Sequence, residues 1–527
     1  VSIPSLSTAV SRHFLMQAEI CLKINFTAGS WEPDEILFSY GKSNSLQAFP
    51  LNSLFSNLQS NLNDTTVSVS SRDVLATLLK MYNFKQLSQY NSLCPSLPDS
   101  FYKNYFDGLE SNNNLLGNYS IGGFGKFNPR GCFPAKLYDD KMVELPSLQV
   151  QCDGSGAAPY PFVYLKFTTT EPLLMLSPYI SGNANNKAAF LGLNTLTITG
   201  TIGDSSRVMS NASYAKLKGK AALTKTIQSV DYVQYSGAKL LLNFLTIPPS
   251  MFSKIEPRNV LNHNQISYYK YTSGGSIPAK TSSTVSFNNI QLGFIPNKFL
   301  ISASKPQKDT YDSNSFMCIK SVSVNFCNKS GLLSSASQTQ LYDMSVRNGL
   351  QMNFYEFGGI GVSNDQNGLP KSVPTTGSIL VIDPALDLSL DAQYSNGSSG
   401  TFNIQFDIQL YNQDTEAIIP ELTLIAINGG VFTTENGVSA ATMGLLNQEM
   451  VLDTKQEPAM IDSHSYFQKV VGGSMENLGA VHKHLKSAFS KVVEKAKAID
   501  NGAGMSAAGM SGGSTEGVKR RIHKYAK

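Results

Sequence analysis

A repeat within the chain constrains its fold more than any single motif does. Residues 54–83 and residues 317–349 share one order of features: an apolar run alternating with polar residues, an Asn-rich turn, paired serines, and a short helix-like segment that ends at Asn. An internal repeat fixes the architecture of a chain before its individual motifs do. The repeat predicts two β domains in tandem, and the alternative is that two polar β segments look alike through composition alone.

The low content of charged side chains favours β structure. Asp, Glu, Lys and Arg make up 15% of the 527 residues, against about 25% in average soluble domains. Asn, Ser, Thr, Gly, Tyr and Phe take their place, which suits pleated strands joined by ordered polar turns. The length allows two or three domains, each with a core of its own. We expect an all-β protein.

Alternation of apolar and polar residues locates many of the strands. The alternation is strict from Phe402 to Leu410 and recurs from Ile20 to Phe26, and a period of two is that of a strand with one buried face. Asn428-Gly429 is a strong hairpin signal. Many short strands separated by turns predict sandwiches rather than a parallel sheet. Further strand-like runs lie at residues 36–40, 162–170, 194–202, 239–247, 288–304, 377–390 and 421–434.

These patterns suggest a division of the chain. An N-terminal arm at residues 1–13 precedes a first β domain at 14–305, and a polar linker at 306–313 leads into a second β domain at 314–455. The remaining residues, 456–527, form a tail. Two segments of the first domain, at about 84–160 and 203–235, show little periodicity, and loops of that length are uncommon unless they serve a surface role. We expect them to project above a sandwich.

The tail differs from the body in charge. Residues 465–527 carry 11 Lys or Arg and 4 Asp or Glu, a net charge of +7, whereas the whole chain carries only +4. Apolar residues recur at spacings of three and four over about 475–499, which predicts a basic amphipathic helix. Such helices bind anionic membranes, nucleic acid or an acidic partner, unless the helix packs on its own domain with a solvated lysine face. The candidate contact residues are Lys483, Lys486, Lys491, Lys495, Lys497, Lys519, Arg520, Arg521, Lys524 and Lys527.

No arrangement of residues indicates catalysis. Gly203-Asp204-Ser205 is similar to an esterase nucleophile motif, but no Asp stands three residues before a His to complete it, so a polar turn is expected. The glycine-rich segments at 121–127 and 358–368 lack the third Gly of a dinucleotide loop and the Lys-Ser/Thr of a phosphate loop. His482 and His484 point apart in the predicted helix. We expect no enzymatic activity, no metal and no cofactor.

The sequence gives little indication of where the protein is located or whether its cysteines form disulfides. No run of about 18 apolar residues occurs, so we expect no membrane-spanning helix. The opening residues, VSIPSLSTAV, lack the basic start and apolar centre of a secretory signal, and the sequence leaves open whether an initiator Met or a longer leader has been removed. The six cysteines form no Cys-x-x-Cys pair and are expected to be free thiols.

The ordered strand patterns resemble a known family. LQAFPLNSLFSNLQSNLNDTTVS at residues 46–68 and IQLGFIPNKFLISAS at 290–304 are similar to the start and the closing strand of the first jelly roll in double jelly-roll major capsid proteins of the adenovirus, polinton and adintovirus lineage. QLYDMSVRNGLQMNFYEFGG at 340–359 and the strands at 376–390, 399–413 and 421–437 resemble the second jelly roll. The resemblance covers most of residues 14–455.

This resemblance implies a fold and a function. The fold is two tandem antiparallel eight-stranded jelly-roll sandwiches with long loop insertions and a basic C-terminal tail. Three protomers would form a pseudo-hexagonal, hexon-like homotrimeric capsomer that tiles an icosahedral shell. The expected location is the virion capsid, assembled in the host cell. Expected partners are neighbouring capsomers, penton or minor capsid proteins, and viral DNA or an internal membrane met by the inward-facing tail.

Other interpretations stay open. One is a secreted or cell-surface glycan-binding β-sandwich, which the six Asn-x-Ser/Thr sequons and the Tyr- and Asn-rich loops favour, and which disulfides would support. Another is a capsid subunit of an unrelated single-jelly-roll virus with a projecting domain, which predicts no internal repeat. A hydrolase with an unusual active site is more distant.

Overall fold

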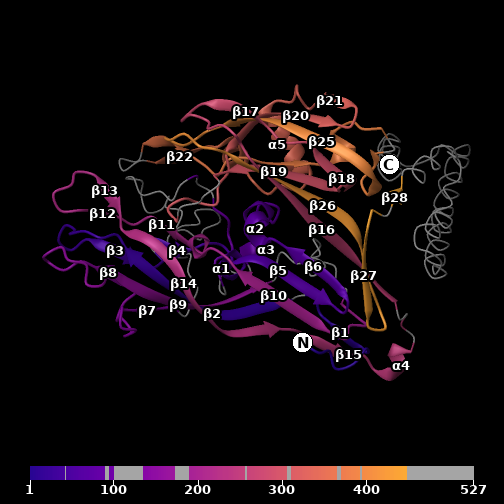
Figure 1. The fold of residues 1–527 in the computed structure, drawn as a ribbon, viewed down its shortest axis with the longest axis horizontal. Coiled ribbons are helices and arrows are strands. Elements are labelled where there is room, and N and C mark those ends of the chain that lie inside the picture. The colour runs from indigo at the N-terminus through magenta and orange to yellow at the C-terminus, as the bar shows by residue number, and fades with distance from the viewer. Residues whose placement is uncertain are drawn as a thin grey trace, which may run out of the picture. The chain divides into compact units, whose positions relative to one another are not determined.

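The structure is a computed structural model of the whole chain. It describes residues 1–447 apart from 13, 42, 89–93, 100–101, 103–134, 173–188, 254, 256–257, 306–309, 365–368, 392–393 and 445. Residues 1–452 form one compact unit, drawn in Figure 1, and residues 453–527 form a second unit that lies outside the described residues. None of the described helices has the length and apolar run needed to cross a membrane.

The later part of the chain folds into a sandwich of two antiparallel sheets. One sheet has the order β16–β26–β19–β24, which are Arg258–Thr272, Glu421–Glu435, Lys298–Ser304 and Ile379–Ile382. The other has the order β17–β25–β20–β21, which are Ser282–Ser286, Ser398–Tyr411, Cys318–Phe326 and Lys329–Leu332. A further strand, β18 (Ile290–Phe294), pairs with β25 next to β17. Neighbours that are distant in sequence are the mark of a jelly roll.

The earlier part of the chain repeats this pairing. Its sheets are β14–β2–β9–β7 (Ile227–Leu241, Leu15–Phe26, Phe162–Pro172, Ala135–Tyr138) and β10–β5–β6 (Leu196–Ile202, Phe55–Leu62, Thr65–Val69). The pairings within two sets of strands correspond: β2 lies between β14 and β9 as β19 lies between β26 and β24, and β5 lies between β10 and β6 as β20 lies between β25 and β21. The helices α2 (Ser71–Leu79) and α5 (Gln338–Arg347) follow β6 and β21 in the chain. The repeat seen in the sequence is therefore confirmed, because its two copies are β5–β6–α2 and β20–β21–α5.

Short elements complete the first sandwich. Three two-stranded ladders form a lobe at the left of Figure 1: β3 (Ile36–Ser39) with β8 (Gln149–Gln151), β4 (Asn44–Leu46) with β11 (Met209–Asn211), and β12 (Tyr214–Lys216) with β13 (Leu223–Lys225). The segment 203–235, which looked irregular in sequence, thus holds the strand β11, the hairpin β12–β13 and the start of β14. Further elements are β1 (Thr8–Val10), α1 (Pro50–Leu54), α3 (Phe84–Ser88), η3 (Ser205–Arg207), β15 (Phe244–Thr246) and α4 (Pro249–Phe252).

The second sandwich begins earlier than the sequence suggested. Strands β16 to β19, between residues 258 and 304, pair with β24, β25 and β26 rather than with the first sandwich, and residues 306–313 join two strands of the second sandwich. A jelly roll separates neighbours in sequence onto different sheets, so local patterns cannot assign a strand to its sheet. The remaining elements are α6 (Phe354–Gly358), β22 (Ile360–Asn364), β23 (Pro370–Pro374), α7 (Pro384–Asp387), β27 (Val438–Met443) and β28 (Leu446–Asn447).

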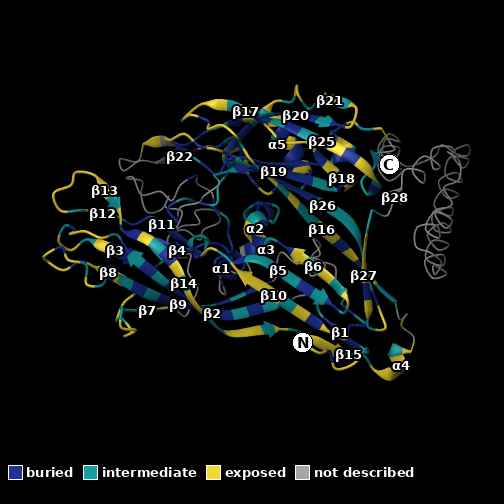
Figure 2. Ribbon diagram, in the orientation of Figure 1, coloured by how far each residue is buried: buried dark blue, intermediate teal, exposed yellow. Residues whose placement is uncertain are grey.

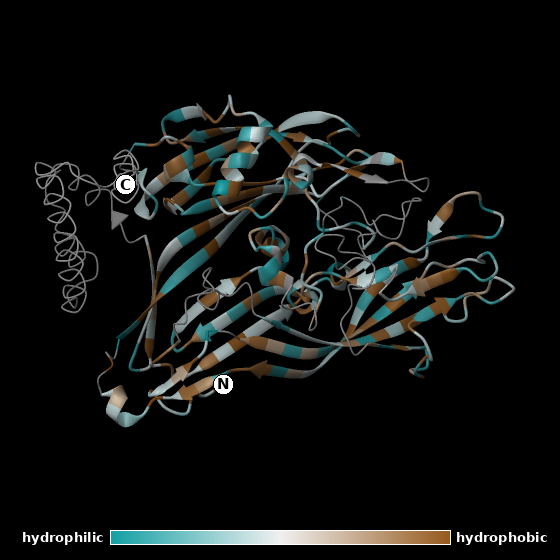
Figure 3. Ribbon diagram, turned by 180° about the vertical axis from the view of Figure 1, so that it is seen from behind, coloured by the Kyte–Doolittle hydropathy of each residue, from teal (hydrophilic) through white to brown (hydrophobic). Residues whose placement is uncertain are grey.

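The cores follow the predicted alternation. In β25 the apolar residues from Phe402 to Leu410 are at most 5% exposed, and Figures 2 and 3 show buried, apolar positions alternating with exposed, polar ones along the strands. Phe406 of β25 packs between the sheets, with its ring 5.8 Å from that of Phe299 and 6.2 Å from that of Phe287. Edge-to-face rings at such distances add to the stabilisation from burial.

The predicted hairpin at Asn428-Gly429 is wrong. Both residues lie inside the continuous strand β26, where a side chain on Gly429 would collide with Asn297. The turn lies at the next Asn-Gly pair, Asn436-Gly437, whose φ angles of 48° and 86° join β26 to β27. Two central residues with positive φ are what a tight hairpin requires. Close packing, rather than a turn, accounts for Gly429.

Removal of the Phe406 ring tests this core. We expect Phe406→Ala to lower the free energy of unfolding by about 3–5 kcal/mol, because it leaves a cavity between the sheets. Chemical denaturation followed by fluorescence measures the change. Leu386→Ala, at a side chain 76% exposed, is the control and is expected to cost about 0.5 kcal/mol or less; equal losses in the two variants would contradict the packing described.

Candidate functional site

Buried polar side chains gather where the two sandwiches meet. The loop at residues 305–317, between β19 and β20, and the helix α2 make most of these contacts, and we call the set the junction. Thr77 of α2 lies 3.3 Å from Ser302 of β19, oxygen to oxygen, and the backbone N–H of Gln351 donates to the carbonyl of Lys80 at 2.8 Å. The junction therefore links the same helix of the first sandwich to two parts of the second.

Tyr311 anchors the loop in the first sandwich. Its side chain is 3% exposed, and its hydroxyl accepts from the N–H of Ile227 at 2.9 Å and donates to the carbonyl of Ser213 at 3.0 Å. The ring lies 5.1 Å from that of Tyr214, and the neighbouring carbonyl of Thr310 accepts from the N–H of Asn211 at 2.8 Å. A tyrosine buried in this way fixes both its ring and its hydroxyl.

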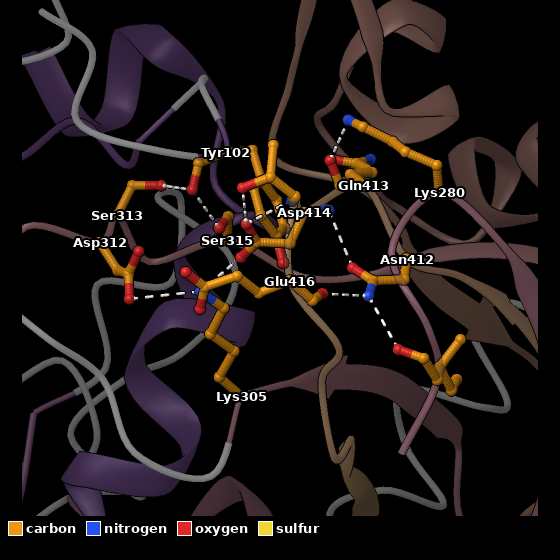
Figure 4. A network of polar contacts seen from close by, with 12 residues as sticks. Tyr102, Lys280, Lys305, Asp312, Ser313, Ser315, Asn412, Gln413, Asp414 and Glu416 are labelled. Carbon is orange, nitrogen blue, oxygen red and sulfur yellow. Dashed lines mark hydrogen bonds and ion pairs between the residues drawn. The ribbon is translucent and has the colours of Figure 1, made fainter.

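The next residues of the loop hold Tyr102 of the first half of the chain (Figure 4). The hydroxyls of Ser313 and Ser315 donate to the Tyr102 carbonyl at 2.7 and 2.8 Å, and the Tyr102 N–H donates to the carbonyl of Pro374 at 3.1 Å. Burial, together with the charge of Asp414, raises the pKa of the Tyr102 hydroxyl. This group stays neutral and acts as part of the packing.

Lys305 carries the charge at the base of the loop. Its ammonium lies 2.6 Å from Asp414, a carboxylate only 1% exposed, and 3.5 Å from Asp312 (Figure 4). Burial alone would lower the pKa of Lys305, but the hydrogen bond from Lys305 to Asp414 and the charges of both carboxylates raise it overall. A buried carboxylate requires such a partner, because an isolated charge is costly to bury.

A second lysine joins the sandwiches directly. Lys270 of β16 lies 2.8 Å from Asp73 of α2 and 2.6 Å from Glu421 of β26. Burial alone would raise the pKa of Asp73, but hydrogen bonds from Lys270 and Ser70 lower it overall. The ion pair is two-thirds buried on the lysine side, so solvent screens it less than it screens a pair on the surface.

The sandwiches also meet at a second place. The N–H of Ser439 in β27 donates to Asp64 in the β5–β6 turn at 2.8 Å. Phe190 of the first half packs against Phe432 of β26, with ring centroids 6.1 Å apart. Contacts at two separated places resist rotation of one sandwich against the other.

The geometry offers structural contacts rather than catalytic chemistry. A small cavity at the junction is lined in part by the charged residues Asp73, Lys305 and Glu421. Asp73 and Glu421 form ion pairs with Lys270, and Lys305 forms ion pairs with Asp312 and Asp414. Within the described ranges, no three His, Cys, Asp or Glu side chains are placed to hold a metal ion. Cys21, Cys152, Cys318 and Cys327 are free thiols, so none of these four supplies a disulfide in support of the glycan-binding interpretation.

The structure confirms one of the features singled out in the sequence and does not describe another. Gly203-Asp204-Ser205 forms the predicted polar turn, in which Asp204 accepts from the N–H of Ser206 at 2.9 Å and the Ser205 hydroxyl donates to the carbonyl of Val230 at 2.8 Å. The ten basic candidates between Lys483 and Lys527, with the predicted helix at 475–499, lie outside the described residues. Sequence reasoning missed the junction, and the one available signal was the aromatic Tyr311 within a polar stretch read as a linker.

Two family models match the chain in order. The family described as Sputnik virophage major capsid protein 1st domain matches residues 1–245, and the family described as Major capsid protein V20 C-terminal domain matches residues 266–430. The putative capsid protein V20 of the Sputnik virophage is 24% identical over 486 residues, which cover 89% of this chain and 76% of that protein. The first match ends at β15 and the second begins within β16.

Solved structures share the fold. The Sputnik virophage structure determined by cryo-EM aligns with a TM-score of 0.72 at 19% identity, over 90% of each chain. The crystal structure of the mavirus major capsid protein aligns with a TM-score of 0.63 at 17% identity, over 84% of this chain and 86% of that one. Both similarities cover more than four-fifths of this chain, which is more than either sandwich alone.

The ion pair at Asp73 gives a pH dependence. Because the pKa of Asp73 is lowered in the folded state, its contribution is present above the ordinary carboxyl pKa and is lost as the pH falls through the lowered value. We expect Asp73→Asn to lower the free energy of unfolding by about 1–2 kcal/mol at pH 7 and by less at pH 3, because the contribution fades as the pH falls from the ordinary carboxyl pKa through the lowered one. Denaturant titrations at both pH values measure this.

The control for that experiment is Asp343→Asn. Asp343 occupies the exposed face of α5, the counterpart of α2 in the second sandwich, and its replacement is expected to change stability by less than about 0.5 kcal/mol. An Asp73→Asn effect that is unchanged between pH 7 and pH 3 would contradict the ion pair.

Proposed function

Because the chain belongs to the lineage of double jelly-roll major capsid proteins, we propose that three copies of it close around a threefold axis into the capsomer of an icosahedral shell. Membership confirms the resemblance seen in the strand patterns, and it makes the chain a structural protein of a virion capsid rather than an enzyme. The finer statements that follow, on trimers, contact surfaces and the tail, are part of the proposal.

The observation that carries the proposal is the repeated strand pairing in one compact unit. Two sandwiches of the same topology in each protomer give six similar sandwiches around a threefold axis. Such a unit is close to hexagonal, and hexagonal units tile a shell with few kinds of contact. The junction supports a role as a capsomer subunit, because a subunit that packs in a regular shell needs a fixed orientation between its two sandwiches.

One exposed surface of the second sandwich suits contact with another subunit. Tyr355 of α6, Ile360 and Val362 of β22, and Leu369 before β23 are between 55% and 70% exposed. Aromatic and aliphatic side chains gathered on a surface are typical of protein interfaces. We assign this face to contacts between protomers or between neighbouring capsomers.

Charge separates the body from the tail. Subtracting the +7 of residues 465–527 from the +4 of the whole chain leaves −3 for the body, and a low net charge limits repulsion between close neighbours. The tail, with its ten basic candidates, would face the shell interior and contact viral DNA, an internal membrane or minor capsid proteins. Penton proteins would occupy the fivefold positions, where hexagonal units cannot close the shell.

The mass of the purified protein tests the proposal first. We expect light scattering to give three times the 57.2 kDa of the chain, and negative-stain images to show particles with a hexagonal outline or closed shells. A stable monomer at every salt concentration, with no assembly, would overturn the proposal and return attention to the glycan-binding interpretation.

Removal of the tail separates two steps of assembly. We expect deletion of residues 474–527 to leave trimers intact, because the two sandwiches lie outside the deleted part, and to impair shell closure or genome packaging. Light scattering reports the trimer, and electron microscopy with nuclease protection reports the shell and its contents. A full-length variant with the ten basic residues replaced by Gln is the matched control for charge. Loss of trimers on deletion would contradict the assignment.

A further inference from the structure

Opposite charges are segregated in the lobe formed by the short ladders of the first sandwich, at the left of Figure 1. Residues 214–226, which contain the hairpin β12–β13, carry four lysines and no carboxylate, and we call them the basic hairpin. Residues 27–41, the acidic segment, carry three carboxylates and no lysine or arginine, and residues 149–161 carry one more carboxylate. The charges of the three segments cancel, although the two signs lie on different parts of the lobe.

Backbone hydrogen bonds place these segments side by side in a fixed order. The acidic segment pairs with β12 on the side away from β13, where the N–H of Glu32 donates to the carbonyl of Lys216 at 2.8 Å. On the other side of the acidic segment, the N–H of Trp31 donates to the carbonyl of Gly156 at 2.8 Å. The basic hairpin therefore lies at one edge of a ladder, and the segments that carry the carboxylates lie at the other.

Charged side chains at both edges are open to contact. Lys218 and Lys220 are exposed on the basic hairpin, which is largely exposed in Figure 2, and Asp34 is exposed while Glu35 is half-buried on the acidic segment. None of these four side chains forms an ion pair with another described residue. The ladder brings no opposite charge to them from within the described part of the subunit.

Each edge also exposes an apolar side chain among its charges. Leu223 of β13, opposite Lys216 in the hairpin, is 56% exposed, and Ile36, which directly follows Glu35, is 36% exposed. An apolar centre with a polar rim is the usual composition of a protein interface. Here the two rims have opposite signs, so the two edges are complementary to each other.

We propose that the basic hairpin of one subunit contacts the acidic segment of the next subunit around the threefold axis. This contact rests on the proposed trimer and names a surface within it. Two different, complementary surfaces on one subunit suit a head-to-tail contact, which closes into a ring when it is repeated around the axis. A second copy of the chain fits the hairpin better than a polyanion such as a sulfated polysaccharide, because the neighbouring carboxylates repel a polyanion.

Charge substitutions at each edge, alone and combined, test this contact. One variant carries Lys218→Glu and Lys220→Glu, and the other carries Asp34→Asn and Glu35→Lys. Asn suits position 34, where φ is 63°, because it tolerates the left-handed region. We expect either variant to raise the protein concentration at which half of the chains are trimers by at least about tenfold, since attraction is lost or reversed at every contact of the ring. Light scattering over a dilution series measures this.

The combined variant tests whether the two edges face each other. With all four substitutions, opposite charges meet again across the contact, so the combined effect is expected to be smaller than the sum of the separate effects. Effects that simply add would overturn the contact. Unchanged trimers in both separate variants would also overturn it and leave the proposed trimer standing, whereas a monomeric unmodified chain would overturn the trimer and the contact together.

Two controls separate the contact from general effects of charge and folding. Lys483→Glu with Lys486→Glu in the tail lowers the net charge as much as the hairpin variant does, and it is expected to leave the trimer unchanged. Trp31 is the single tryptophan of the chain and is fully buried in this ladder, so its fluorescence reports whether the lobe stays folded.

Salt dependence provides a readout that needs no variant. We expect the unmodified trimer to dissociate more readily as NaCl is raised from about 0.05 to about 0.5 M, because salt screens exposed charges. If a substitution alters the Trp31 fluorescence, Lys218→Gln with Lys220→Gln replaces the reversal, and it is expected to reduce this salt dependence. An unmodified trimer whose dissociation does not change with salt would overturn the proposed contact.

Discussion

The insertion of one loop of the second sandwich into the first is the contact on which the arrangement of the molecule depends. Buried apolar side chains of both sandwiches belong to one connected cluster, but apolar packing is not directional, so the exact relation of the sandwiches needs a further constraint. Tyr311 supplies that constraint, with a hydroxyl that both accepts from Ile227 and donates to Ser213 of the first sandwich. Buried polar contacts of this kind add little net stability but penalise every arrangement that leaves them unpaired. The ion pairs of Lys270 and Lys305 act in the same way at either side of the loop.

A buried carboxylate plays a similar part inside the first sandwich. Glu171, at the end of β9, is fully buried and accepts from the N–H groups of Leu51 and Asn52 at 2.7 and 3.0 Å, from the Asn52 side chain at 2.8 Å and from the Thr169 hydroxyl at 2.8 Å. Burial raises the pKa of Glu171, and these four hydrogen bonds oppose that shift. They tie β9 to α1, the short helix that leads directly into β5. One side chain thus connects the two sheets of the sandwich.

The sequence predicted the strands of this fold better than their partners. Strict alternation identified β25 and β2, because a period of two depends only on residues that are adjacent in sequence. The repeat identified two similar units, because β5–β6–α2 and β20–β21–α5 are each continuous in sequence. Pairing is not local: β19 hydrogen-bonds to strands that lie about 80 to 120 residues later, so its membership of the second sandwich was misjudged. The junction was missed for the same reason, since Tyr311 meets Ser213 across almost 100 residues of chain. Asn428-Gly429 shows the limit of a local signal, because packing against Asn297 decided its conformation.

Charge placement connects the fold to assembly. The buried carboxylate of Asp414 and the partly buried carboxylate of Asp73 are paired with lysines of the same chain, so the junction contributes little field to the outer surface. The body then meets its neighbours with a net charge near zero, where short-range apolar contacts can dominate over repulsion. The proposed contact of the tail with a polyanion would depend on basic residues that lie outside this body. Under that proposal, salt weakens the contact with the polyanion more than it weakens the apolar contacts between neighbouring subunits.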